Sequence, residues 1–225
     1  MAIAQNLLKI KQGIIDVCAK ARRGQEEITI VAVSKGRSAQ EIKQALASGI
    51  TDIGENRLQE ALPKFKELLG LNLQPRTHMV GHLQTNKVKE AVQNFDLIQS
   101  VDSLHLALEI DRQAARINKI QDILVEVKTS DEITKFGVKP PDLESFIAEA
   151  VKLKNVSIKG LMTIAPLSNN PQDARPYFRH LREILSGLGR KGYGLSILSM
   201  GMTDDYKVAI EEGSTMIRLG RAVFE

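Results

Sequence analysis

Short apolar runs alternate with amphipathic segments along almost the whole chain. Eight runs are rich in β-branched residues and typical of buried strands. They cover residues 28–35, 51–55, 76–81, 95–102, 122–129, 157–164, 195–200 and 214–220. Between them, apolar residues recur at helical spacing over residues 41–49, 57–69, 84–93, 103–117, 141–153, 174–188 and 204–213. The pattern predicts strands and helices in strict alternation.

A further amphipathic segment precedes the first strand. Ile3, Leu7, Ile10 and Ile14 fall on one face of this segment, and Gly24 follows it as a stop signal. We therefore expect an additional N-terminal helix that packs outside the strands.

The length and the number of the repeats indicate which kind of parallel sheet the strands form. A repeat of about 27 residues accommodates one strand, one crossover helix and two short turns. Strands joined in this way form either an open sheet or a closed barrel. Eight strands within 225 residues favour a (β/α)8 barrel. No linker rich in Pro, Gly or Ser divides the chain, so residues 1–225 are expected to form one domain.

Composition narrows the class of protein. Hydrophobic residues make up 43% and charged residues 26% of the chain, which is ordinary for a globular protein. A single cysteine, Cys18, cannot form an internal disulfide, and no apolar stretch resembles a signal peptide or a membrane span. We expect a cytoplasmic protein without a membrane partner. The net charge of +4 is scattered along the helices and aromatic residues are 4%, so a nucleic-acid partner is not expected.

In a barrel of this kind the functional site forms at the carboxyl ends of the strands. Lys35 directly follows the apolar run IVAV, so its side chain is expected to lean over the barrel mouth. There an amine partly removed from water is a nucleophile that forms Schiff bases with aldehydes. The competing interpretation is a surface lysine at a strand end.

The loops after the last two strands read SMGMTDD and RLGRA. Their small residues allow close backbone approach, Ser199 and Thr203 supply hydroxyls, and Arg218 supplies a fork for phosphate oxygens. An amine and a phosphate site at one mouth favour pyridoxal 5′-phosphate (PLP), which carries both an aldehyde and a phosphate. Phosphorylated sugars would satisfy the same chemistry.

Two other motifs have structural interpretations. Gly187, Gly189 and Gly192 match GxGxxG but follow a helix and precede a strand, the reverse of the dinucleotide-binding context. His78 and His82 lie at the two ends of one strand without an acidic or cysteine partner nearby in the sequence. We expect packed or hydrogen-bonded histidines and no metal site.

Motifs along nearly the whole chain resemble the pyridoxal phosphate homeostasis proteins, also called YggS or PROSC proteins. They are VAVSK, DIGENRLQEA, HMVGHLQTNK, IQSVDS, VEVKTSDEITKFG, IKGLMTIAP, LSMGMTDDYKVAIEEGSTMIRLG and AVF. The resemblance implies a PLP-binding (β/α)8 barrel of the alanine racemase N-terminal type, without the C-terminal β-domain of that enzyme. It also implies which residues bind the cofactor. Lys35 would carry PLP as a Schiff base, Asn56 and Met162 would lie beside the ring, His82 would lie nearby, and the phosphate side would comprise Ser199, Gly201, Arg218 and Gly220.

The resemblance implies a protein that holds, buffers or delivers PLP and so affects amino-acid and keto-acid balance. A monomer is expected, because the barrel pattern shows no obvious additional interface element, and a weak dimer is the alternative. PLP-dependent apoenzymes or a regulatory protein are the expected partners. Two alternatives remain open, an amino-acid racemase and a regulator that reports cofactor level. Racemisation needs an acid or base on each face of the reacting carbon. In alanine racemases the tyrosine opposite the lysine comes from a C-terminal region that this sequence does not show, and Tyr206 is the only tyrosine near the phosphate loop.

Overall fold

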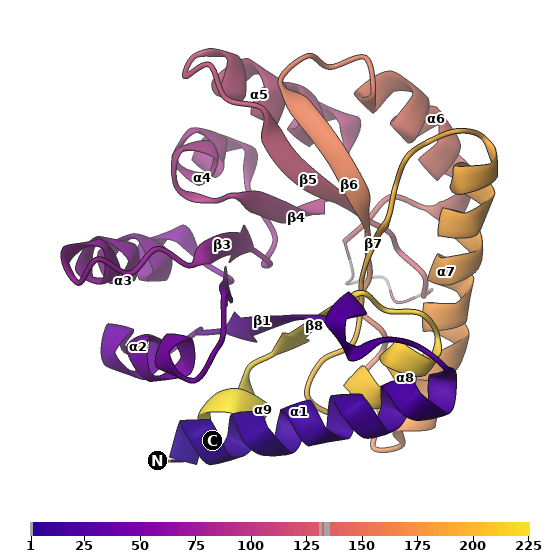
Figure 1. The fold of residues 1–225 in the computed structure, drawn as a ribbon. Coiled ribbons are helices and arrows are strands. Elements are labelled where there is room, and N and C mark those ends of the chain that lie inside the picture. Colours follow the sequence, from indigo (N-terminus) through magenta and orange to yellow (C-terminus); the bar gives the residue numbers. More distant parts are fainter. Residues whose placement is uncertain (1, 131, 133–135) are drawn as a thin grey trace.

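Eight parallel strands close into a barrel in sequential order (Figure 1). The computed structural model describes residues 2–130, 132 and 136–225. The strands are β1 (Thr29–Val33), β2 (Asp52–Glu55), β3 (Arg76–Met79), β4 (Leu97–Val101), β5 (Gln121–Glu126), β6 (Val156–Met162), β7 (Ile197–Ser199) and β8 (Met216–Leu219). Closure comes from the parallel pairing of β1 with β8, in which Val31 lies opposite Arg218. The predicted barrel is confirmed.

Helices surround the strands in the predicted places. They are α1 (Ala2–Ala21), α2 (Ala39–Ala47), α3 (Leu58–Gly70), α4 (Val88–Asn94), α5 (Leu104–Ala115), α6 (Pro140–Ala150), α7 (Arg175–Arg190), α8 (Tyr206–Glu211) and α9 (Arg221–Phe224), with 3₁₀ turns η1 (Gln25–Glu27), η2 (Thr85–Lys87) and η3 (Pro171–Ala174). The segment predicted as one helix over 84–93 divides into η2 and α4. Helix α9 was not predicted, because four residues are too few to show a helical period.

The connection from β1 to α2 is fixed by a local hydrogen-bond pattern. Ser38 is the N-cap of α2: its side chain accepts from the backbone N–H of Glu41, and the Glu41 carboxylate accepts from the Ser38 N–H. This capping box satisfies two backbone donors that the first turn of a helix leaves unpaired. The helix therefore begins at a defined residue, shortly after Lys35.

Helix α1 packs outside the barrel against α8 and α9, which brings the two chain ends together (Figure 1). Its apolar face is buried, including Leu7 and Cys18, as predicted. The Asn6 side-chain amide donates to the Val223 carbonyl at 3.2 Å. Gly13 allows the close approach of α8, because a Cβ there would lie 2.7 Å from the Tyr206 Oη.

The core has an outer layer and an inner layer. Most apolar side chains pack between the strands and the surrounding helices. Inside the barrel a small cluster contains Val31, Leu97, Leu124, Met162 and Met216. Other inward positions carry polar side chains, among them His78, Gln99, Ser199 and Arg218, which are described with the site below. The barrel interior is therefore only partly apolar.

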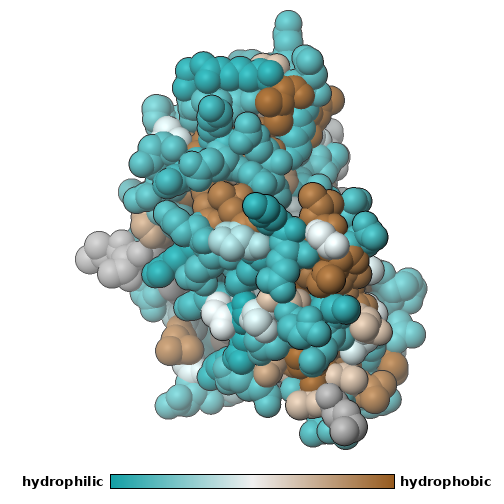
Figure 2. Space-filling view, turned by 90° about the vertical axis from the view of Figure 1, so that its left-hand side faces the viewer, coloured by the Kyte–Doolittle hydropathy of each residue, from teal (hydrophilic) through white to brown (hydrophobic). Residues whose placement is uncertain are grey.

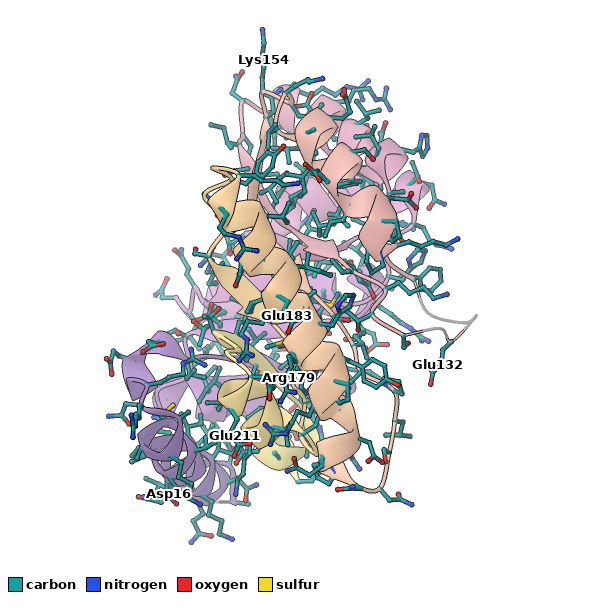
Figure 3. All side chains as sticks on the ribbon, turned by 90° about the vertical axis from the view of Figure 1, so that its right-hand side faces the viewer. Asp16, Glu132, Lys154, Arg179, Glu183 and Glu211 are labelled. Atoms are coloured by element: carbon teal, nitrogen blue, oxygen red, sulfur yellow. The ribbon has the colours of Figure 1, made fainter. Side chains whose placement is uncertain are left out.

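A buried carboxylate joins α7 to the end of α8. Glu212, only 4% exposed at its side chain, pairs with Arg175, Arg179 and Arg182 of α7 at 2.8, 3.0 and 3.3 Å. Figure 3 shows Arg179 and Glu183 along α7, beside Glu211 of α8. Because ion pairs inside a partly dry site are worth more than exposed ones, this cluster holds the two helices together.

The surface is mainly polar on the side that lies at the left in Figure 1. Figure 2 shows that side as hydrophilic with small hydrophobic patches set apart from one another. Among the described residues, none of the helices is long and apolar enough to span a membrane.

Candidate functional site

Lys35 lies in the turn that directly follows β1, at the carboxyl end of the barrel. Its side chain is exposed, so the partial removal from water that its apolar neighbours suggested is not found in this structure. The preceding residue is tightly held. The Ser34 carbonyl accepts from Lys64 Nζ at 2.7 Å, and the Ser34 hydroxyl donates to Glu55 Oε1 at 2.5 Å. The backbone that carries Lys35 is thus anchored to β2 and α3.

Glu55 is the centre of that anchor. Its carboxylate is 0% exposed and pairs with Lys64 through Oε1 at 2.7 Å. Its other oxygen, Oε2, is buried without a hydrogen-bond partner among the described residues. A buried carboxylate is costly unless it is paired and hydrogen-bonded, so Glu55 depends on Lys64.

The loops after β2 and β3 meet at the carboxyl end of the barrel. Gly81 approaches Asn56 so closely that a Cβ at residue 81 would lie 2.3 Å from the Asn56 carbonyl oxygen. The His82 ring stacks on the exposed Phe136 ring with centroids 3.7 Å apart, and His82 Nδ1 lies 3.3 Å from Asp102 Oδ2. Asn56 and His82 are therefore on neighbouring walls of the mouth.

Arg218 points into the barrel and is 4% exposed. Its Nη1 donates to Ser199 Oγ at 2.7 Å, and its Nη2 donates to the Thr163 carbonyl at 2.9 Å. Burial lowers the pKa of the guanidinium to about 10, while the nearby carboxylates of Glu126 and Asp205 act in the opposite direction. Arg218 is thus a buried cation held on two sides and not an exposed fork.

The loops after β7 and β8 give the mouth its close backbone approach. Gly201 has φ +95°, and a Cβ there would lie 2.6 Å from the Ala209 Cβ. The next backbone N–H, of Met202, donates to Asp205 Oδ1 at 2.6 Å. Burial raises the pKa of the Asp205 carboxyl. Gly220 follows β8 beside β1, where a Cβ would be 3.4 Å from the Val33 carbonyl oxygen.

Barrel closure brings most of the predicted residues to one mouth. Lys35, Asn56, Ser199, Gly201 and Gly220 lie on or just after β1, β2, β7 and β8, which are neighbours in the closed sheet. Two further residues named from the sequence make contacts away from the open mouth. Met162 is fully buried in the inner apolar cluster, and the Thr203 Oγ1 accepts from the Ala222 N–H at 3.3 Å, which ties it to α9.

Two polar residues of the barrel interior, Asp52 and Gln99, were missed at the sequence level. His78 bonds to Asp52 and to Gln99, and Gln99 bonds to Ser199. The prediction of a hydrogen-bonded histidine is confirmed for His78. The described residues contain no group of three or more His, Cys, Asp or Glu side chains suited to a metal ion. The sequence feature that could have identified Asp52 and Gln99 is the alternation of side chains along each strand, which turns both residues toward the barrel interior.

Comparison with known proteins identifies the family of this chain. The family model of the alanine racemase N-terminal domain matches residues 5–225. A pyridoxal phosphate homeostasis protein of Aquifex aeolicus is 41% identical over 100% of this chain and 98% of its own. PipY of Synechococcus elongatus PCC7942, solved with PLP bound, is 34% identical with a TM-score of 0.87, covering 99% of this chain and 100% of its own.

A more distant structure shares the fold alone. An alanine racemase of Clostridium difficile 630 is 17% identical with a TM-score of 0.73, and the match covers 99% of this chain but 56% of the racemase. The fold and site define a (β/α)8 barrel of the alanine racemase N-terminal type. Within that class, the chain belongs to the pyridoxal phosphate homeostasis protein family, and it matches the members from Aquifex aeolicus and Pseudomonas aeruginosa over 98% and 94% of their length.

Proposed function

We propose that this protein binds PLP at the barrel mouth and acts in PLP homeostasis, by holding, buffering or delivering the cofactor. The observation that carries the proposal is the meeting, at adjacent strand ends, of an exposed amine, a buried guanidinium and glycine-lined loops. These are Lys35, Arg218, Gly201 and Gly220. Family membership and the PLP bound to PipY support the same assignment.

The donor set suits the two functional ends of PLP. When bound, PLP supplies an aldehyde carbon and a conjugated pyridine ring that withdraws electrons. Lys35 supplies the nucleophilic amine, and its fixed backbone limits where that amine reaches. Ser199, Gly201, Arg218 and Gly220 form the proposed phosphate side, because backbone N–H groups and a guanidinium suit an anion. Asn56, His82 and Met162 are the proposed ring-side residues.

Storage or delivery is favoured over racemisation. Racemisation requires a proton donor or acceptor on both faces of the reacting carbon. Tyr206, the tyrosine nearest the phosphate loop, instead places its hydroxyl beside Gly13 of α1, outside the barrel. Tyr177 and Tyr193 pack against the outer core. The relatives also carry the name of homeostasis proteins and not that of an enzyme.

The proposal includes the oligomeric state, the cellular location and the partners of the protein. We infer that the 225 residues act as one domain, as a monomer in the cytoplasm, where a single buried thiol such as Cys18 stays reduced. An exposed Lys35 at an open mouth suits exchange of PLP with PLP-dependent apoenzymes or with a regulatory protein.

One experiment tests the central proposal. The purified protein is incubated with PLP, its visible absorption spectrum is recorded before and after borohydride reduction, and the modified peptide is mapped. The expected result is a PLP band that reduction converts into a stable pyridoxyl group on Lys35. A protein without a PLP band, or with the adduct spread over surface lysines, contradicts the proposal.

A further inference from the structure

A directional chain of hydrogen bonds crosses the barrel interior beneath the mouth. It runs from Arg218 to Ser199 at 2.7 Å, from Ser199 to Gln99 at 2.6 Å, from Gln99 to His78 at 2.8 Å and from His78 to Asp52 at 2.9 Å. Four of the five side chains are at most 4% exposed, and Asp52 is 6% exposed. Other barrels of this fold usually fill such positions with Val, Ile or Leu, so a continuous polar chain here needs a reason.

The two charged ends of the chain fix its direction, because the Arg218 guanidinium only donates and the Asp52 carboxylate only accepts. A guanidinium only donates, so Ser199 Oγ accepts from Arg218. The Ser199 hydroxyl hydrogen is then free to go to Gln99 Oε1, which accepts it. That orientation turns the amide nitrogen of Gln99 toward His78.

The same logic fixes the tautomer of His78. Gln99 Nε2 donates to His78 Nδ1, so Nδ1 carries no hydrogen. The ring proton is therefore on Nε2, which donates to the Asp52 carboxylate. The hydrogen bonds from His78 and Thr51 outweigh the effect of burial, which raises the pKa of Asp52, and hold that pKa below its usual value. Asp52 is thus an anion that can accept at the far end of the chain.

Turning Gln99 over would break the chain in two places. Its NH₂ group would then face Ser199, and the Ser199 hydroxyl hydrogen would lose Gln99 Oε1 as its acceptor. Its carbonyl would face the unprotonated Nδ1 of His78, and two acceptors would oppose each other. Unsatisfied groups at such depth are costly, so one orientation is selected.

We propose that Gln99 and His78 are positioning residues for the cofactor site: they orient the Ser199 hydroxyl as an acceptor for Arg218 and so hold the guanidinium at the base of the mouth. The role of these hydrogen bonds toward a cofactor rests on the proposed PLP function. The donor and acceptor assigned to each bond do not depend on that function. Neither residue touches the mouth itself; each acts through Ser199.

The test begins with the cofactor-free protein. Proton–nitrogen correlation spectra of the His78 ring at pH 7 should show the neutral tautomer protonated on Nε2. In the near-isosteric variant Gln99→Glu the carboxylate accepts from both neighbours, so His78 should gain a proton on Nδ1 while Ser199 and Arg218 stay bonded. A wild-type His78 protonated on Nδ1 at pH 7 overturns the proposed direction.

Cofactor retention is measured second. Gln99→Leu removes the acceptor for Ser199, and PLP retention in equilibrium dialysis should fall about tenfold, the effect of losing one charge-assisted contact. Gln99→Glu should retain PLP within about twofold of wild type. The matched control is Gln121→Leu, an equally buried glutamine at the amino end of the barrel. It should leave both the His78 spectrum and PLP retention unchanged.

The outcomes separate the two proposals. If Gln121→Leu weakens retention as much as Gln99→Leu, or if Gln99→Leu retains PLP like wild type, the positioning role is refuted. If Gln99→Leu fails to fold, the spectra and retention of Gln99→Glu decide the question. If wild type binds no PLP but shows the expected His78 tautomer, the proposed function fails while the directional chain stands.

Discussion

The ammonium of Lys64 lies 2.7 Å from the carboxylate of Glu55, next to the turn that carries Lys35; the Glu55 side chain is 0% exposed and that of Lys64 is 13% exposed. The same ammonium donates to the Ser34 carbonyl at 2.7 Å. One ion pair therefore links β2, α3 and the end of β1. Loss of this ion pair is therefore expected to shift the backbone that carries Lys35.

Replacing Lys64 by Met should destabilise the fold. The change leaves the Glu55 carboxylate buried without its cation, and removing one partner of a buried pair costs about 3–5 kcal/mol. Urea unfolding followed by circular dichroism measures the loss. Lys66→Met is the control, because Lys66 is exposed on the same helix. A loss below about 1 kcal/mol would mean that Glu55 is solvated or protonated when Lys64 is absent.

Lys35→Ala should abolish covalent PLP attachment and leave the fold intact. The side chain is exposed and contributes little to the core. Borohydride reduction followed by peptide mapping should find no pyridoxyl group at residue 35, with the melting temperature unchanged. Lys43→Ala, at an exposed position on α2, should keep full attachment. An unchanged yield of lysine-linked PLP in Lys35→Ala would assign the attachment to another lysine.

Arg218→Ala should weaken PLP retention. Loss of a charge-assisted contact costs about 1.5–3 kcal/mol, or roughly tenfold to more than a hundredfold in affinity. Equilibrium dialysis gives the dissociation constant. The neighbouring Arg221→Ala is the control, since the Arg221 side chain is 63% exposed and pairs with Asp204. If the affinity of Arg218→Ala equals that of wild type, Arg218 serves only the interior of the barrel.

The pure protein should not efficiently interconvert alanine enantiomers. Lys35 can serve one face of the substrate, but Tyr206 lies beside α1 and cannot serve the other. Chiral chromatography after incubation with PLP and either enantiomer measures conversion. Robust racemisation that Lys35→Ala abolishes would establish the enzyme alternative, and Tyr206→Phe would then be the next variant to assay.

Glu212→Gln should destabilise the contact between α7 and α8 by about 2 kcal/mol at pH 7, because charge-assisted hydrogen bonds become neutral. Burial raises the pKa of Glu212, but hydrogen bonds from Arg179 and Arg175 outweigh it and the pKa is lowered overall. The unfolded carboxyl therefore holds its proton to a higher pH than the folded one. The stabilisation is present above the unfolded pKa of about 4.3 and is lost as the pH falls through the lower folded value.

Urea unfolding at pH 7 and pH 3 measures this difference. The gap between wild type and Glu212→Gln should narrow at the lower pH. Glu183→Gln is the control, since Glu183 is exposed on α7, the helix that carries the three arginines (Figure 3). An equal gap at both pH values would show that the charge of Glu212 does not stabilise the fold.

The sequence predicted the barrel because its signals are local. The capping box at Ser38 and the strand–helix alternation each depend on residues close together in the chain. The same logic placed Lys35, Ser199 and Arg218 at strand ends. It missed the 3₁₀ turns η1, η2 and η3 and the short helix α9, since three or four residues carry too little periodicity.

By itself, then, the sequence determined the number, type and order of the main elements and which residues stand at the carboxyl ends of the strands. Only the tertiary structure decided what those residues touch. Ser199 and Gln99 are 100 residues apart and meet because barrel closure sets the register across the interior. The burial of Arg218 and the exposure of Lys35 were decided in the same way. Contacts between inward positions depend on the packing of all eight strands, and no local pattern contains that information.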